Sequence, residues 1–335
     1  MLAPFVPRML TIASSPTLAQ RRWEDIAVKR FLRLSRISAW PAYSLAFVIP
    51  FAAGASELTS WFKALVGFLA LFMFASFAFA LNFYSDRDTD SYHDGVQKDF
   101  NLSQQPMVTG EVSEKQCKAF CVATFLAAIG LSFVVSGLFA VLVILACLAG
   151  GVLYSHRKIR LKAKPVGDVL CISVLGMLVP SAGYLLGAGT LPTPLMMLLW
   201  FFVTATGYIA SVMSDFEFDR RAGLRTTAVY LGQARSLKAM LVGCLLSLVV
   251  AFFVFRGYYP LGTRYFALFA TAALVALTAA AWRSLKPPRM DIPVFFKHGR
   301  WVFPSLGVIS LLFLGYALLR IYMPEYLPWD PFSVL

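Results

Sequence analysis

The chain has 335 residues, of which 59% are hydrophobic, 15% aromatic and only 14% charged. Soluble globular domains carry about 25% charged residues, so this composition argues against a water-soluble protein and indicates that the solvent is largely a lipid bilayer. The net charge of +13 then indicates cytoplasmic loops beside anionic lipid head groups, and we expect membrane lipids rather than nucleic acid as partners.

Residues 1–36 form a basic N-terminal segment with seven Arg and Lys residues against two acids. It has no continuous apolar core followed by a small-residue cleavage site, so we expect no secretory signal. We interpret the segment as a basic amphipathic stretch that lies on the membrane surface. An organelle transit peptide is the alternative, because the first twenty residues contain no acid.

Nine apolar stretches follow, each close to the roughly 20 residues that a helix needs to cross a bilayer. Between the third and the fourth only Ser136 and Gly137 intervene, which predicts a tight helical hairpin. The pattern predicts an all-α membrane domain of nine helices over residues 37–322, with a short tail at 323–335. The stretches are approximately 37–56, 61–84, 115–135, 137–155, 168–188, 193–213, 236–256, 263–283 and 301–322.

The charges of the predicted loops indicate the orientation. Basic clusters lie at 156–164, 219–225 and 283–300, which are the loops after the fourth, sixth and eighth stretches. The loops after the third and fifth stretches contain no Lys or Arg. Because positive loops stay on the cytoplasmic side, we expect the N-terminus and the even-numbered loops in the cytoplasm. We favour a bacterial inner membrane over an organelle membrane.

Carboxylates gather at the ends of two predicted helices on that side. Asn82, Asp86 and Asp90 are spaced by four residues, as are Asp215 and Asp219. Residues four apart lie on one helix face, where like charges destabilise the helix. Each group therefore calls for a compensating cation, although ordinary solvated helix ends would give the same composition.

The residue types favour Mg²⁺ as that cation. Magnesium takes one or two carboxylates, keeps several waters and bridges to substrate phosphates. His93 and His156 are isolated in the sequence, so zinc is not indicated. The expected ligands are oxygen donors, namely Asn82, Asp86, Asp90, Asp215 and Asp219.

A cationic patch lies between the two acidic groups. Tyr154 and Lys158 are four residues apart, which would place them on one helix face and favours Lys158 as a phosphate ligand. Charge that merely keeps the loop cytoplasmic explains Arg160 and Lys164 equally well. The patch comprises Arg157, Lys158, Arg160, Lys162 and Lys164.

The three motifs in this order, after the second, fourth and sixth of nine helices, resemble those of the UbiA superfamily of intramembrane prenyltransferases. The segment Ser214 to Gly232, SDFEFDRRAGLRTTAVYLG, is similar to the second aspartate motif of that family. The resemblance implies a helical bundle around a central cavity, capped by cytoplasmic loops. It also implies Mg²⁺-dependent transfer of a polyprenyl group from its diphosphate to an aromatic, quinone-precursor or lipid-like acceptor.

The resemblance further assigns roles to individual residues. Asp86, Asp90, Asp215 and Asp219 would be the catalytic carboxylates that act through Mg²⁺. The diphosphate would be bound by Asn82, Tyr154, Lys158 and Arg225.

Two positions depart from the family pattern. Gln105 precedes Pro106 where an arginine is usual, and Ser211 stands where some members have a third aspartate. These departures leave open terpene cyclisation, in which a double bond of the substrate replaces the acceptor.

A cation-coupled transporter is the reading from another class. Transporter carboxylates lie near the bilayer midplane at broken helices, whereas these lie at helix ends on one side. Diphosphate release that depends on an acceptor would indicate a transferase, and release without an acceptor would indicate a cyclase or a hydrolase. No release would indicate neither kind of prenyl chemistry.

Overall fold

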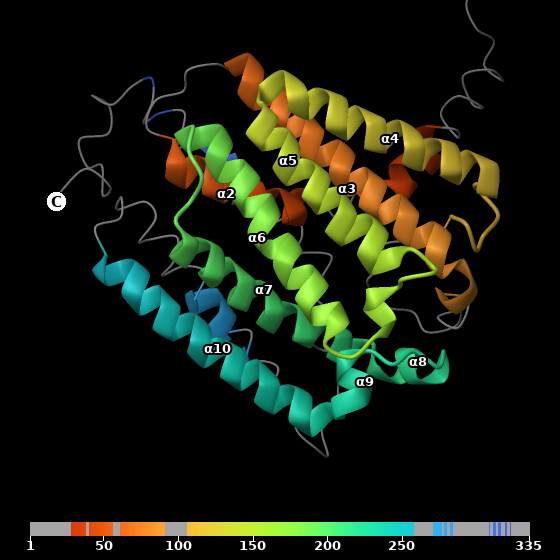
Figure 1. The fold of residues 1–335 in the computed structure, drawn as a ribbon. Helices are drawn as coiled ribbons and strands as arrows, with labels where there is room; N and C mark the ends of the chain where they lie inside the picture. Colours follow the sequence, from red (N-terminus) through yellow and green to blue (C-terminus); the bar gives the residue numbers. More distant parts are fainter. Residues whose placement is uncertain are drawn as a thin grey trace, which may run out of the picture.

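The computed structural model describes residues 28–37, 40–55, 61–90 and 106–257, together with isolated short stretches between 271 and 322. All regular structure in these residues is helical, which confirms the all-α prediction. Long helices run side by side in a bundle, and shorter helices lie at one end of it (Figure 1). The short stretches are 271–276, 278–279, 282–283, 308, 311–312, 314–315, 319 and 322.

The seven N-terminal apolar stretches each coincide with a helix to within a few residues, although helix α3 continues six residues past its predicted end. The predicted stretches 263–283 and 301–322 lie largely outside the described residues, so the total of nine remains a prediction. The helices are α2 (Trp40–Gly54), α3 (Trp61–Asp90), α4 (Glu114–Val135), α5 (Gly137–Ala146), α6 (Gly167–Ala188), α7 (Pro194–Ser214), α8 (Phe216–Arg221), α9 (Thr227–Leu231) and α10 (Gln233–Arg256).

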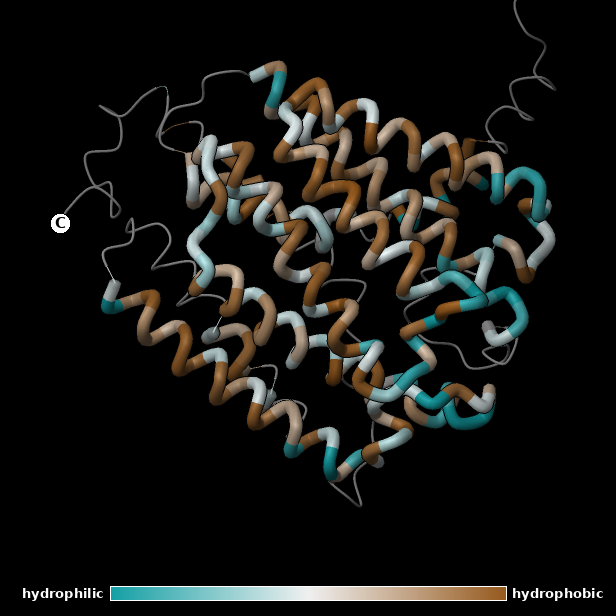
Figure 2. The backbone as a smooth tube through the Cα atoms, in the orientation of Figure 1, coloured by the Kyte–Doolittle hydropathy of each residue, from teal (hydrophilic) through white to brown (hydrophobic). Residues whose placement is uncertain are grey.

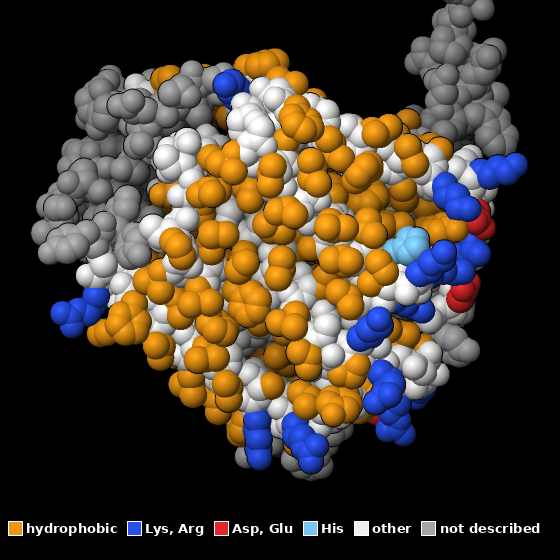
Figure 3. Space-filling model, viewed as in Figure 1, with side chains coloured by type: hydrophobic (Ala, Val, Ile, Leu, Met, Phe, Trp, Pro, Cys, Tyr) orange, Lys and Arg blue, Asp and Glu red, His pale blue; other side chains and the backbone are white. Residues whose placement is uncertain are grey.

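Five of these helices, namely α3, α4, α6, α7 and α10, are long and apolar enough to cross a membrane. Two shorter apolar helices cover residues 43–54 and 137–153. Hydrophobic side chains cover most of the visible face, and Lys and Arg gather along its edges (Figure 3). Contiguous exposed apolar surface of this extent requires a lipid environment, so the chain is an integral membrane protein.

The predicted hairpin between α4 and α5 is present. Ser136 is at once the C-cap of α4 and the N-cap of α5, in an extended conformation. Its N–H donates to Ser132 O at 3.2 Å, and its hydroxyl accepts the N–H of Phe139 at 3.1 Å. One residue thus satisfies backbone groups of both helix ends. The two helices can therefore be joined without a longer loop between them.

Helices α2 and α6 approach each other closely through two glycines. A Cβ atom at Gly183 would lie 2.3 Å from Phe47 O, and one at Gly187 would lie 2.2 Å from Phe51 O. Small residues spaced by four let backbones meet in membrane proteins, where helix association depends on packing rather than on the hydrophobic effect. These contacts anchor α2 against the centre of the bundle.

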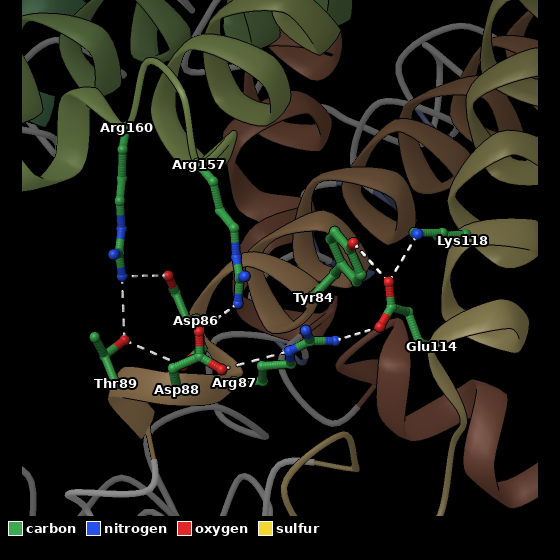
Figure 4. A network of polar contacts seen from close by, with 9 residues as sticks. All are labelled: Tyr84, Asp86, Arg87, Asp88, Thr89, Glu114, Lys118, Arg157 and Arg160. Carbon is green, nitrogen blue, oxygen red and sulfur yellow. Dashed lines mark hydrogen bonds and ion pairs between the residues drawn. The ribbon is translucent and has the colours of Figure 1, made fainter.

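Helix α3 continues to Asp90 because polar contacts hold its end against the start of α4. Glu114 accepts hydrogen bonds from Arg87 at 2.7 Å and from Tyr84 at 3.0 Å, and it pairs with Lys118 at 2.7 Å (Figure 4). The hydrophilic residues of the described chain concentrate at this end, where α3 ends and α8 and α9 lie (Figure 2). The candidate site lies at the same end.

Candidate active site

Asp86 is a buried carboxylate surrounded by donors. Its side chain is 3% exposed, and its Oδ1 accepts a hydrogen bond from Arg160 at 3.1 Å. Asn82 donates to Oδ2 at 2.8 Å, and the ammonium group of Lys162 contacts the same oxygen. A buried charge is tolerated only when it is paired and hydrogen-bonded, and here two cations and an amide do this.

Asp88 lies on the other side of α3, as its position two residues after Asp86 predicts. Its side chain is 68% exposed and pairs with Arg157 at 2.5 Å and with Arg87 at 3.4 Å. Asn82 and Asp86, in contrast, share the inner face. Figure 4 shows the two carboxylates directed to different arginines. The four-residue spacing from Asn82 therefore predicted correctly that Asp86 faces inward and that Asp88 does not.

The cations that reach Asp86 differ from the one that the sequence favoured. The helix ends at Ser155, so Lys158 lies in the following turn and its side chain is exposed. Arg160, with a φ of +41°, turns the chain back, and the short 3₁₀ helix η4 (Leu161–Ala163) follows. This reversal brings Arg160 and Lys162 to Asp86, whereas Tyr154 and Lys158 do not share a helix face.

Tyr154 follows a π-helical segment, η3 (Cys147–Leu153). Gly150 and Gly151 in this segment face the side chains of Leu175 and Phe77, which leave no room for a Cβ atom. The Tyr154 hydroxyl lies 3.0 Å from the hydroxyl of Tyr208 on α7. Wide turns of this kind are frequent at functional sites, and this one places Tyr154 against the helix that leads to Asp215.

The second acidic pair faces the same region. Asp215 ends α7 and Asp219 lies in α8, and the N–H of Asp219 donates to Asp215 O at 2.8 Å. Burial lowers the pKa of Lys162 to about 7, and the carboxylates of Asp219 and Asp215 oppose this shift because they favour the charged ammonium. Both acids also act electrostatically on Tyr154. Lys162 therefore contacts Asp86 of the first acidic group and interacts electrostatically with both acids of the second.

Arg36 is a candidate residue that the sequence analysis did not single out. Its guanidinium carbon lies 4.5 Å from the ring centroid of Phe83 and 5.2 Å from that of Phe79. Its Nε atom is buried and lacks a hydrogen-bond partner in the part of the chain that the structure describes. Its charge also acts on Lys162. In the sequence it was only one of several arginines before the first apolar stretch.

Several expected residues cannot be placed in this way. The side chain of Asp90 and residues 91–105, which include His93 and Gln105, lie outside the described residues. Arg225 is exposed in the turn after α8. No group of three His, Cys, Asp or Glu side chains that could hold a metal ion occurs among the residues described. The oxygen donors present nevertheless match the preference of Mg²⁺, which needs only one or two carboxylates per ion.

The chain was compared with known proteins. The model of the UbiA prenyltransferase family matches residues 40–303. The chain belongs to this family. It is 29% identical over 239 residues to a 4-hydroxybenzoate octaprenyltransferase of Alkalilimnicola ehrlichii, covering 70% of this chain and 74% of that relative.

Two further relatives come from archaea. This UbiA family member is 26% identical over 212 residues to a digeranylgeranylglyceryl phosphate synthase of Natronomonas pharaonis, covering 62% of this chain and 71% of the relative. A solved structure of a UbiA homolog from Archaeoglobus fulgidus, bound to DMAPP and Mg²⁺, superposes with a TM-score of 0.79. It is 29% identical and covers 88% of this chain and 99% of that chain.

Proposed function

We propose that this UbiA family member is a Mg²⁺-dependent prenyltransferase that moves a polyprenyl group from its diphosphate to an aromatic, quinone-precursor or lipid-like acceptor. The observation that carries the proposal is the buried carboxylate of Asp86, which pairs with Arg160 and Lys162. Of these two cations, Lys162 also feels the charges of Asp215 and Asp219. The relative from Alkalilimnicola is named as an octaprenyltransferase, and the one from Natronomonas is named for a product that carries two geranylgeranyl groups.

The carboxylates would hold the metal in two groups. Asn82, Asp86 and Asp90 would form the first group, and Asp215 with Asp219 the second. Bound Mg²⁺ would supply positive charge to the leaving diphosphate. The Archaeoglobus homolog was solved with a diphosphate and Mg²⁺ together, which supports such a site in this chain.

Arg160 and Lys162 would change partner when the substrate binds. Oδ2 of Asp86 already accepts two donors, from Asn82 and Lys162, so a metal ion that binds this oxygen would take the place of one of them. A diphosphate offers the displaced ammonium an alternative set of anionic oxygens. Lys158 and Arg225, which are both exposed, would bind the outer phosphate oxygens. Tyr154 would bind the diphosphate on the side of the reacting carbon.

The reaction breaks one C–O bond and forms one bond to the acceptor. The allylic C–O bond of the donor ionises, and diphosphate leaves with the electron pair. A carbon or oxygen atom of the acceptor then attacks the allylic cation and loses a proton. Preorganised positive charge at the leaving group lowers the barrier most, while the partly buried tyrosine pair Tyr154–Tyr208 would help to keep water from the cation.

The acceptor class is the finer part of the proposal. The two named relatives use different acceptors, an aromatic acid and a glycerol phosphate lipid. Both acceptors are anionic, and Arg36 offers a partly buried cation beside the ring of Phe83. We therefore favour an acceptor that carries a carboxylate or a phosphate group. The active-site loops would lie in the cytoplasm, because they are basic.

The decisive experiment is product mass spectrometry. Membranes containing the protein are incubated with prenyl diphosphates of several chain lengths, including geranylgeranyl diphosphate, together with Mg²⁺ and a panel of anionic and neutral acceptors. A prenylated acceptor supports the proposal. Diphosphate release with a cyclic hydrocarbon and no acceptor would show a cyclase instead, and absence of diphosphate release with every donor length would contradict prenyl chemistry.

A further inference from the structure

Asp168 is a fully buried carboxylate in the first turn of α6 that the proposed function does not use. Its Oδ1 accepts the N–H of Val169 at 2.8 Å, and its Oδ2 accepts the N–H of Thr227 at 2.8 Å. The hydroxyl of Thr227 also donates to Oδ1. Removing such an acceptor leaves buried donors unsatisfied, which is costly, so this carboxylate holds Thr227 firmly.

The hydrogen bonds continue beyond Asp168. Thr227 is the first residue of α9 and lies 59 positions later in the chain. Its Oγ1 accepts the N–H of Val166 at 2.7 Å. Val166 has a φ of +66°, which is unfavourable for a β-branched residue unless the surroundings impose it. We call the set Val166, Asp168 and Thr227 the latch.

The latch joins the two segments that carry the candidate site. The segment 156–166, which ends at Val166, carries Arg160 and Lys162, the two cations on Asp86. The segment 215–226, which ends just before Thr227, carries Asp215, Asp219 and Arg225. Both segments are short and polar, and they leave different helices. Without a fixed connection, their spacing would depend on loop conformations that many states could satisfy.

We propose that Asp168 is a positioning residue, which sets the spacing between the cationic segment 156–166 and the acidic segment 215–226 through Thr227. This inference rests on the proposed function, because the spacing matters only if one diphosphate is held by both segments. Asp168 itself contacts no reacting atom.

A distance measurement tests the latch without any substrate. Nitroxide labels are attached at His156→Cys and Arg221→Cys, two exposed positions on the two segments. The background is the full-length protein with its five buried native cysteines replaced. Double electron–electron resonance then reports the distribution of label distances. We expect one narrow distribution in the parent protein and in Thr227→Ser, and a broader or shifted one in Asp168→Asn and Thr227→Val.

Kinetics provide the second readout. Asp168→Asn should raise the KM for the diphosphate donor about tenfold, the scale of one lost hydrogen bond to a charged group, with a smaller change in kcat. Thr227→Ser, which keeps the hydroxyl, should have a KM within about twofold of the parent value. Ser173→Ala is the matched control, because Ser173 is buried in α6 and, within the described part of the chain, its hydroxyl bonds only to its own helix, at Val169 O.

The outcomes separate the two proposals. Folded Asp168→Asn protein with the parent distance distribution and the parent KM would overturn the latch, and Thr227→Val decides if Asp168→Asn does not fold. If the parent protein turns over no prenyl diphosphate, the proposed function fails alone, since the label distances still show whether the latch holds the segments. An equal change in Ser173→Ala would show general loosening of α6 and would also overturn the inference.

Discussion

Lys162 and Asp86 are in contact although 76 residues separate them in the chain. Both side chains are largely buried, with 13% and 3% of their surfaces exposed. This ion pair joins the segment after η3 to the end of α3. Together with the pair to Arg160, it stabilises the negative charge of the buried Asp86.

Replacing Lys162 with methionine should therefore destabilise the protein. Loss of one partner of a buried pair costs about 3–5 kcal/mol when the other charge is left unpaired, and Arg160 should reduce this to about 1–2 kcal/mol. Thermal unfolding in detergent measures the effect. Because Mg²⁺ would also neutralise Asp86, the loss should be larger in EDTA than in saturating Mg²⁺. Lys115→Met, at an exposed position on α4, is the control, and an unchanged midpoint for Lys162→Met would contradict the pairing.

Single removal of each acid that we propose as a metal ligand should lower turnover by at least about a hundredfold, the scale of one lost electrostatic stabiliser. The variants are Asp86→Ala, Asp90→Ala, Asp215→Ala and Asp219→Ala. Asp88→Ala should be much milder, because Asp88 is exposed and its pairs with Arg157 and Arg87 are worth at most about 1 kcal/mol. Initial rates at saturating donor measure this, and equal losses at Asp88 and Asp86 would refute the division between the two faces.

Removal of divalent metal should abolish diphosphate release. The proposed function requires Mg²⁺ to neutralise the leaving group, and the oxygen ligands expected here also suit Mn²⁺. Activity in EDTA should fall to background and return when excess MgCl₂ is added. Undiminished turnover in the chelator would show that the protein cations alone suffice.

Gly183 should tolerate no side chain. A Cβ at Gly183 would lie 2.3 Å from the backbone oxygen of Phe47, so Gly183→Ala must push α2 from α6, which costs roughly 1–3 kcal/mol. We expect a lower unfolding midpoint in detergent. Gly130→Ala is the matched control, because nothing lies within 4 Å of a Cβ there and alanine favours the helix. A larger loss at Gly130 would contradict the packing.

The orientation can be tested by labelling single cysteines in a background without the five native ones. Arg221→Cys should react with a membrane-impermeant thiol reagent from the cytoplasmic face, since basic loops resist translocation. Thr190→Cys, exposed in the uncharged turn after α6, should react only from the opposite face. Gly223, with a φ of +69°, is avoided because a side chain there would be strained. Labelling of both positions from one side would reject the predicted topology.

The sequence by itself determined the elements and the chemistry of the candidate site. Apolar runs of about 20 residues located the first seven helices, because crossing a bilayer requires internally satisfied backbone over a fixed length. The four-residue spacing of Asn82 and Asp86 identified an inward-facing pair, because helix periodicity is a local property. The order of the motifs also identified the family, which the match over residues 40–303 established.

Only the tertiary structure decided which cations meet Asp86. Helical spacing favoured Lys158, but the helix stops at Ser155 and the backbone reverses at Arg160, which brings Arg160 and Lys162 inward instead. Arg36 and Asp168 likewise carried no local signal. Their roles arise from contacts with residues tens of positions away, such as Phe83 and Thr227, and such contacts depend on how helices pack rather than on the spacing of residues within one helix.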